Sequence, residues 1–267
     1  MLVWARSGRI LAWAILGILV GIVYGLPLGL IALASFAGQW NGALPSHFTF
    51  GNYGAVLSGD PGTQLKVSIV TGLVASVIAL TVGSWAALAL RGLAVVPRRI
   101  LDLLFFIPSA VPSVSVGLGL LVAFSQPPLL LNGTVKIVIL AHFILISAFT
   151  YGNVSAGLSR IAPEYEQMAA SLGAKPAYAL WHVLLPLMRP YLLAAFSLSF
   201  ALSMGELGAT VMVYPPGWVT MPVGIFALTD RGDVFQGAAL TMILTATTLA
   251  VLIALSLVPN KAAARQA

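Results

Sequence analysis

Long apolar runs, separated by short polar segments, dominate this chain. Six of them are long enough to cross the hydrocarbon core of a bilayer, which takes about 20 apolar residues per helix. Lipid offers no hydrogen-bond partners to backbone groups, so each run is predicted to be an α-helix. The predicted spans are residues 10–36, 67–90, 100–124, 135–158, 191–213 and 237–258.

One polar segment, residues 159–189, is longer than a simple connection between two spans. It contains two helix-length pieces, which follow Pro163 and Pro176. Gly173 suits a left-handed helix cap between them, and Pro186 is expected to end the second piece. Each piece carries an apolar stripe; the stripe residues are Met168, Ala169 and Leu172, then Leu180, Trp181, Leu184 and Leu185. This bent pair of helices is therefore predicted to be a docking surface for a partner protein.

The composition agrees with a membrane protein. Hydrophobic residues make up 60% of the chain, charged residues 7%, and the mean hydropathy is +1.01. Soluble domains carry about a quarter charged residues. The first run is too long for a cleaved signal peptide. We therefore expect an all-α membrane protein with six transmembrane helices, in which residues 1–267 form a single transmembrane domain.

The distribution of Lys and Arg predicts the orientation. If the N-terminus is cytoplasmic, ten of these residues lie inside, and only Lys66, Lys136 and Arg231 lie outside. Cytoplasmic loops carry the excess of positive charge in membrane proteins. Both termini and residues 159–189 are therefore predicted to be cytoplasmic. The net charge of +6 is explained by this topology, so it does not indicate nucleic-acid binding.

Metal-binding and catalytic constellations are not apparent in the sequence. His47, His142 and His182 are predicted to lie outside, within and inside the membrane, so no two of them are expected to share an ion. The chain has no cysteine and no GxxxxGK[ST] nucleotide cradle. We therefore expect no cofactor in this chain, and any ATP to be hydrolysed by another subunit.

The segment after Pro163 resembles the EAA loop of type I ABC importer permeases. Gln167, Met168 and Ala169, then Gly173, then Val183, Leu185 and Pro186 follow the spacing of that motif. Gln167 stands at the position of the motif's glutamate, which makes the neighbouring Glu166 the alternative carboxylate. The resemblance implies the type I permease fold, with cytoplasmic coupling helices seated in a groove of an ATPase. The residues that it assigns to coupling are Glu164, Glu166, Gln167, Ala169, Ala170, Gly173, Ala174, Val183, Leu185 and Pro186.

Residues 37–46, 106–126 and 205–232 extend the resemblance to the 2-aminoethylphosphonate permeases of bacteria, although the Gly-Glu-Leu-Gly-Ala core at 205–209 also resembles sulfate, molybdate and thiamine permeases. It implies an inner-membrane permease subunit of an ATP-driven importer, for 2-aminoethylphosphonate or for one of those other solutes. The implied partners are a cytoplasmic ATPase dimer, which binds ATP and Mg, a second and different permease chain, and a periplasmic binding protein. An ion-driven carrier and an intramembrane enzyme are the alternatives; the EAA-like loop favours the importer.

The predicted spans contain polar residues that are candidates for a translocation path or gate. Glu206 lies within the fifth run, where an unpaired carboxylate would cost several kcal/mol. It is expected either to attract the ammonium group of a substrate or to accept hydrogen bonds at a helix break. The third run carries Pro108, Pro112, Ser113, Ser115, Gly117 and Gly119, which indicate either a kinked helix packed through small residues or a pore-facing kink. His142 and Asn153 are expected to form interhelical hydrogen bonds, and Asn153 is also a path candidate.

The loop at residues 214–236 is the second candidate contact surface. Its Tyr-Pro-Pro-Gly-Trp turn and the apolar and charged residues that follow predict a short amphipathic element at the membrane surface. The resemblance implies that it meets the binding protein, whereas the alternative is interfacial anchoring by Tyr214 and Trp218. The docking candidates are Tyr214, Trp218, Phe226, Asp230 and Arg231.

Overall fold

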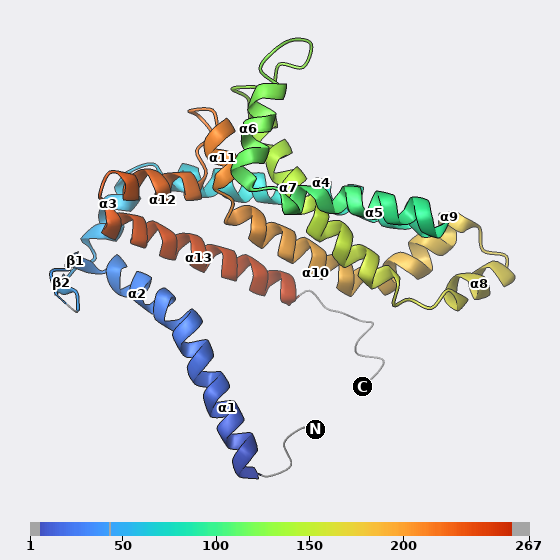
Figure 1. Cartoon of the computed structure of the whole chain (residues 1–267), viewed down its shortest axis with the longest axis horizontal. Helices are drawn as coiled ribbons and strands as arrows, with labels where there is room; N and C mark the ends of the chain where they lie inside the picture. Colours follow the sequence, from blue (N-terminus) through green and yellow to red (C-terminus); the bar gives the residue numbers. More distant parts are fainter. Residues whose placement is uncertain (1–5, 43, 258–267) are drawn as a thin grey trace. The chain divides into compact units, whose positions relative to one another are not determined.

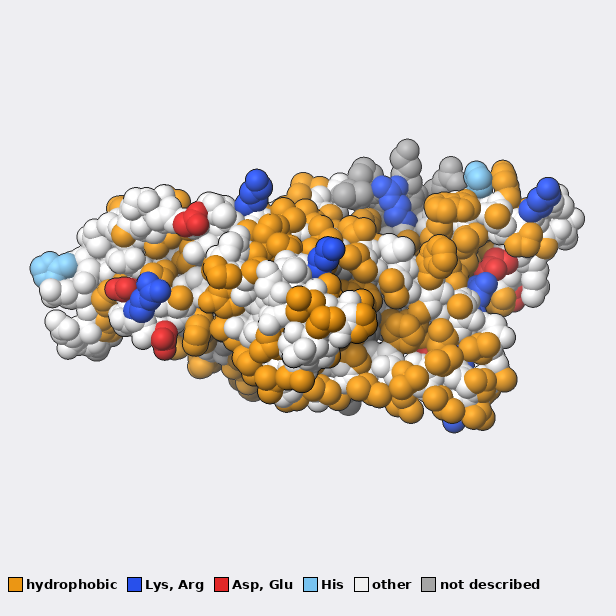
Figure 2. Space-filling view, turned by 90° about the horizontal axis from the view of Figure 1, so that it is seen from above, with side chains coloured by type: hydrophobic (Ala, Val, Ile, Leu, Met, Phe, Trp, Pro, Cys, Tyr) orange, Lys and Arg blue, Asp and Glu red, His pale blue; other side chains and the backbone are white. Residues whose placement is uncertain are grey.

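The computed structural model describes residues 6–42 and 44–257 (Figure 1). The predicted Val258 end of the last span, and Lys261 and Arg265, lie outside the described residues. The chain divides into two compact units, one formed by residues up to Gly62 together with Gly224–Ala246, and the other mainly by Thr63–Val223. Hydrophobic side chains cover most of the face that Figure 2 presents, as expected for a surface that meets lipid.

The first unit contains the N-terminal helix, a short hairpin and part of the last helix. Helices α1 (Arg6–Val20) and α2 (Leu26–Ser35) are joined by a π-helical turn, η1 (Gly21–Gly25), into one apolar helix that covers the predicted first span except for Phe36, its C-cap residue. Strands β1 (Ala37–Gln39) and β2 (Ser46–Phe48) pair antiparallel, and α3 (Gly51–Ser58) follows. The Asn52 amide donates hydrogen bonds to the carbonyls of Ser35 and Ala37, which satisfies acceptors where α2 ends.

The second unit holds most of the remaining helices. They are α4 (Pro61–Arg91), α5 (Val95–Ala110), α6 (Ser113–Ala123), α7 (Val135–Leu158), α8 (Glu164–Ser171), α9 (Pro176–Ala179), the π-helical turn η2 (Leu180–Leu184), α10 (Leu185–Met204) and α11 (Gly208–Val213). Three helices cross the boundary between the units: α4 by its first two residues, and α12 (Met221–Asp230) and α13 (Val234–Ser256) more extensively. The second and fourth predicted spans are confirmed by α4 and α7, and the sixth by α13 as far as residue 256.

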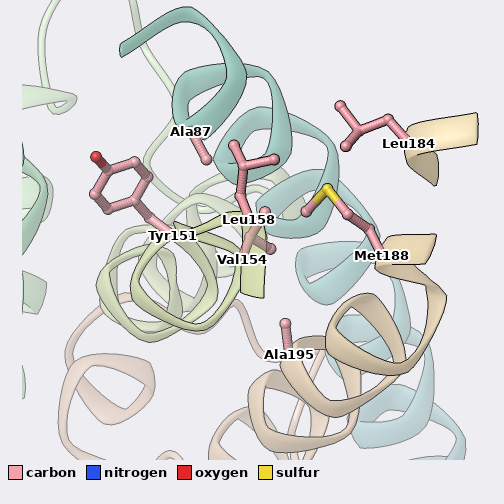
Figure 3. Close-up of a cluster of buried hydrophobic side chains, with 7 residues drawn as sticks. All are labelled: Ala87, Tyr151, Val154, Leu158, Leu184, Met188 and Ala195. Carbon is pink, nitrogen blue, oxygen red and sulfur yellow. The ribbon is translucent and has the colours of Figure 1, made fainter. Parts of the chain in front are cut away.

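A buried apolar cluster lies beside the predicted coupling segment (Figure 3). Ala87 comes from α4, Tyr151, Val154 and Leu158 from α7, and Leu184, Met188 and Ala195 from η2 and α10. Phe105 of α5 stacks on the Tyr151 ring, with 4.5 Å between the ring centroids. The cluster therefore joins the base of the predicted coupling segment to three membrane helices.

The third predicted span is divided into two helices by a bend much sharper than a kink within one helix. Helices α5 and α6 are bent by 100° at Val111 and Pro112 (Figure 1). Pro112 has no N–H to donate, and a residue before proline is disfavoured in the helical region. Val111 accordingly has an extended backbone, with φ −95° and ψ 133°. The structure thus has five apolar helices long enough to cross a membrane among its described residues, and six if this bent pair forms one span.

The predicted helix end at Pro186 was wrong. Residues Pro176–Met204 form one apolar helix, because η2 lies just before Pro186 and places it in the first turn of α10. In η2 the backbone bonds span five residues, as from the Leu185 N–H to the Leu180 carbonyl, so the missing N–H of Pro186 falls where the bonding pattern returns to that of an α-helix. The predicted fifth span is interrupted instead at its other end. The helix stops at Met204, and α11 begins only at Gly208.

Candidate coupling loop and membrane path

Helix α8 is bounded by a proline and a glycine, as predicted. Pro163 is its N-terminal cap residue, and Gly173 has φ +82°, which confirms the predicted left-handed conformation. The Gly173 N–H donates to the Ala170 carbonyl at 2.9 Å, and the Ala174 N–H to the Ala169 carbonyl at 3.0 Å. These two bonds form a Schellman motif, which ends α8 and turns the chain toward α9.

The turn between α8 and η2 presents large apolar side chains to the surroundings. The Leu172 side chain is 88% exposed and Trp181 is 66% exposed, and Met168 and Tyr178 are also exposed. A hollow of about 490 Å³ lies between α8 and the following helix, lined by Ala169, Gly173, Ala174 and Val183 among others. Exposed apolar patches of this kind mark protein contact sites, so the geometry suits a partner surface that fills the hollow.

The predicted coupling residues lie on three consecutive elements. Glu164, Glu166, Gln167, Ala169 and Ala170 are on α8, Gly173 and Ala174 follow it, Val183 is in η2, and Leu185 and Pro186 open α10. None of these side chains is fully buried. The structure therefore brings the coupling candidates together on one segment of the chain; their role and the side of the membrane on which they lie stay predictions.

Glu166 makes a contact that the sequence analysis missed. The Arg91 guanidinium at the end of α4 donates from Nη1 and Nη2 to the two carboxylate oxygens of Glu166, at 2.6 and 2.8 Å. This hydrogen bonding to Arg91 holds the pKa of the Glu166 carboxyl below its ordinary value. The alternative carboxylate of the EAA-like motif is thus engaged within the chain. Arg91 is at the C-terminal end of α4 and Glu166 at the N-terminal end of α8, and these helix ends favour a positive and a negative charge respectively. This placement is the feature of the sequence that could have indicated their pairing.

The two helix breaks, in α5–α6 and in α10–α11, meet within the second unit. Helix α6 packs against α11 so closely that a Cβ atom on Gly117 would lie 2.7 Å from the Ala209 carbonyl oxygen. A Cβ on Gly208 would clash with the Ser113 hydroxyl oxygen. Small residues therefore let the backbones of the two short helices touch, as the small-residue interpretation of the third run predicted.

Glu206 lies at this meeting point. Its Oε1 atom accepts a hydrogen bond from the Ala209 N–H at 2.7 Å, in the first turn of α11. The carboxyl also borders a cavity of about 190 Å³, which is lined by Ser113 and His142 as well as apolar residues of α5, α7 and α10. The hydrogen-bonded alternative for Glu206 matches this contact, and the carboxyl also interacts with the Ser113 hydroxyl.

His142 connects the two sides of the second break. His142 is on α7, and its ring is buried. Its Nδ1 atom is 2.6 Å from the Ser203 hydroxyl of α10, and its Nε2 atom is 2.9 Å from the Thr210 hydroxyl of α11. The predicted interhelical hydrogen bonding is confirmed for His142. Asn153 differs from that prediction, because its amide donates to the Phe149 carbonyl one turn earlier in its own helix.

The remaining path candidates are separated from this cavity. Pro112 and Ser115 are exposed, and the Pro112 carbonyl accepts hydrogen bonds from the N–H groups of Ser115 and Val116 at the start of α6. Of the predicted path residues, the structure thus brings Ser113 and Glu206 to one cavity, and leaves Pro112, Ser115 and Asn153 off its lining.

The predicted outer loop is held to α4 rather than lying free on a surface. The Trp218 indole N–H donates to the Thr71 hydroxyl at 2.9 Å, and the Met221 N–H donates to the Ser68 hydroxyl at 2.8 Å. Met221 and Val223 are buried, whereas Tyr214, Phe226, Asp230 and Arg231 are exposed. Four of the five docking candidates therefore remain accessible, and Trp218 fixes the loop.

We expect the contact between α6 and α11 to tolerate no side chain at Gly117. Gly117→Ala places a methyl group against the Ala209 backbone, and overpacking of this kind costs about 1–3 kcal/mol of stability. Gly119→Ala on the same helix is the matched control, because nothing lies within 4 Å of its added methyl group. Thermal unfolding in detergent should show a lower Tm for Gly117→Ala only. Equal Tm values for the two variants would contradict the packing.

Comparison with known proteins agrees with these features. Residues 79–260 match the family described as binding-protein-dependent transport system inner membrane component. The chain is 52% identical over 261 residues, 98% of both chains, to PhnV of Salmonella paratyphi A (strain ATCC 9150 / SARB42), a permease protein named for a 2-aminoethylphosphonate transport system.

Two solved structures share the fold. One is a bacterial ABC transporter involved in import of the acidic polysaccharide alginate, with TM-score 0.74, 14% identity and 94% of both chains covered. The other is a bacterial alginate ABC transporter in complex with an alginate pentasaccharide-bound periplasmic protein. It has a TM-score of 0.72 and 15% identity, and the match covers 94% of this chain and 93% of that chain. The extent of the family match, together with the membrane helices on which it falls, leads to one conclusion: the chain belongs to the inner-membrane components of binding-protein-dependent transport systems.

Proposed function

We propose that this chain is the permease subunit of an ATP-driven importer for 2-aminoethylphosphonate in a bacterial inner membrane. The observation that carries the proposal is the 52% identity, over 98% of both chains, to a permease named for that substrate. The matched region covers 98% of the chain and so extends across both helix breaks, where a solute would pass. The chain itself is a membrane subunit without a catalytic role.

The ATPase dimer, with its bound ATP and Mg, docks on the coupling segment at residues 159–189. The exposed apolar side chains of Met168, Leu172 and Trp181 support this assignment, because they form a surface without a partner in the described part of the chain. A second permease subunit, encoded by a different chain, completes the path. The periplasmic binding protein meets the outer loop at Tyr214, Phe226, Asp230 and Arg231.

The helix Pro176–Met204 suggests how force crosses the membrane. Its first turns belong to the coupling segment and its last residue borders the break at Gly205. Closure of the ATPase dimer pushes on α8 and η2, tilts α10 with the neighbouring α7, and opens the path outward. ATP must then bind more tightly to the outward-open state than to the inward-open state, since only a difference in affinity shifts the equilibrium.

Uptake into proteoliposomes tests the substrate. The chain is reconstituted with its ATPase, second permease and binding protein, and ATP-dependent accumulation of labelled 2-aminoethylphosphonate is measured beside sulfate, molybdate and thiamine. We expect accumulation of the aminophosphonate alone. Accumulation of one of the other three solutes in its place would show that the substrate is wrong while the transport class is right.

Cysteine labelling tests the proposed orientation. The chain contains no cysteine, so single cysteines at Ser171 and Gly217 are unique targets for a membrane-impermeant reagent. Gly217→Cys should be labelled from the periplasmic side, and Ser171→Cys only after the membrane is opened. Labelling of both from the same side would contradict the arrangement in which 159–189 is cytoplasmic.

A further inference from the structure

Helix α8 is attached to the rest of the protein by few contacts. None of its residues is buried. Ser171 bonds within the helix, and in the described part of the chain no side-chain hydrogen bond other than those of Glu166 joins α8 to another element. By contrast, η2 is anchored by Leu184, which is buried in the cluster with Ala87 of α4. Helix α8 packs on α9 and η2, and among the described side-chain hydrogen bonds and ion pairs only the Arg91–Glu166 pair joins it directly to α4.

The geometry of this pair suits a mechanical connection. Two parallel N–H···O bonds fix both the distance and the relative orientation of the guanidinium and carboxylate planes, which a single contact does not. Arg91 is in the last turn of α4, and Glu166 is in the first turn of α8, so each charge is also stabilised by the opposite partial charge of its own helix end. The pair bridges the rim of a hollow of about 480 Å³ between Leu88, Ala170 and Leu180, which leaves apolar contact between the two helices incomplete.

We propose that the Arg91–Glu166 pair makes α8 follow the cytoplasmic end of α4, so that Arg91 is a positioning residue for coupling between ATP hydrolysis and transport. This proposal rests on the function proposed above. It gives α4, a helix outside the coupling segment, a direct share of the movement that the ATPase imposes on α8. It also gives Glu166 an internal partner, in place of a contact with the ATPase.

The pair's contribution to folding is expected to be small. Its side chains are 41% and 31% exposed, and ion pairs in water-accessible positions add little to stability. Loss of the pair should therefore leave the protein folded and inserted while it loosens α8. This separates a positioning role from a structural role, which would lower the Tm.

The experiment compares Arg91→Gln, Glu166→Gln and the charge exchange Arg91→Glu with Glu166→Arg. In proteoliposomes, the ratio of substrate taken up to ATP hydrolysed should fall about fivefold in each single variant, the low end of coupling between sites, at unchanged Tm. The exchange should recover most of the ratio. Arg99→Gln, which removes an exposed arginine of α5, is the matched control and should leave the ratio unchanged.

A second measurement does not depend on the substrate. Spin labels at Trp85→Cys on α4 and Ser171→Cys on α8 report the distance between the two helices, and Arg91→Gln should broaden the distance distribution. An unchanged distribution, or an unchanged ratio in both single variants, would overturn the proposal. If the unaltered importer takes up no aminophosphonate, the substrate assignment fails, and the distance distribution alone decides on the pair.

Discussion

Gly173→Val is expected to abolish uptake while the protein still inserts into the membrane. Gly173 has φ +82°, in the left-handed region where a Cβ atom costs about 1–2 kcal/mol and a β-branched side chain costs more. The Schellman bonds from Gly173 and Ala174 would break, and the chain would leave the end of α8 in another direction. Uptake and ATPase assembly should be measured together with membrane abundance.

The control for this prediction is Gly173→Asn. Asparagine tolerates the left-handed conformation better than other residues with a side chain, and nothing lies within 4 Å of an added Cβ at this position. The asparagine variant should therefore keep most of the uptake. If the valine variant retains both ATPase assembly and full substrate-stimulated hydrolysis, then the coupling role of the 159–189 segment is wrong.

Replacement of Glu206 should separate its two interpretations. Glu206→Leu removes the acceptor of the Ala209 N–H, and an unsatisfied buried donor costs about 1–3 kcal/mol. Glu206→Gln keeps a carbonyl oxygen in the same place. We therefore expect uptake to be lost in the leucine variant and largely kept in the glutamine variant, with assembly and ATP hydrolysis measured beside it. A glutamine variant that assembles and hydrolyses ATP normally but transports nothing would instead show that the charge itself acts on the substrate.

Some elements followed directly from the sequence because local and tertiary preferences agree there. The predicted span 135–158 coincides with α7, whose apolar run contains no proline and is bounded by polar turns. The left-handed Gly173 was also predictable, since a glycine between two helix-length pieces has few other uses. In both places, the residues adjacent in sequence are enough to predict the local structure.

Other features depend on contacts between distant residues. Pro112 indicated a kink, but a 100° bend arises where α6 can also pack its Gly117 against Ala209, 92 positions later in the chain. Pro186 indicated a helix end, yet a π-helical turn before it lets the helix continue. Arg91 and Glu166 are 75 residues apart, and either charge alone is typical of a cytoplasmic helix end. Patterns of hydrophobicity contain no signal for such pairings.

The continuous helix from Pro176 to Met204 restricts how this protein can evolve. Its 29 residues correspond to about 43 Å at 1.5 Å per residue, more than the roughly 30 Å of the hydrocarbon core. One residue inserted between Trp181 and Gly205 would rotate one end by about 100° relative to the other. The proposed docking face would then point in another direction relative to the break at Gly205. The number of residues between them therefore sets this orientation, whatever their identity.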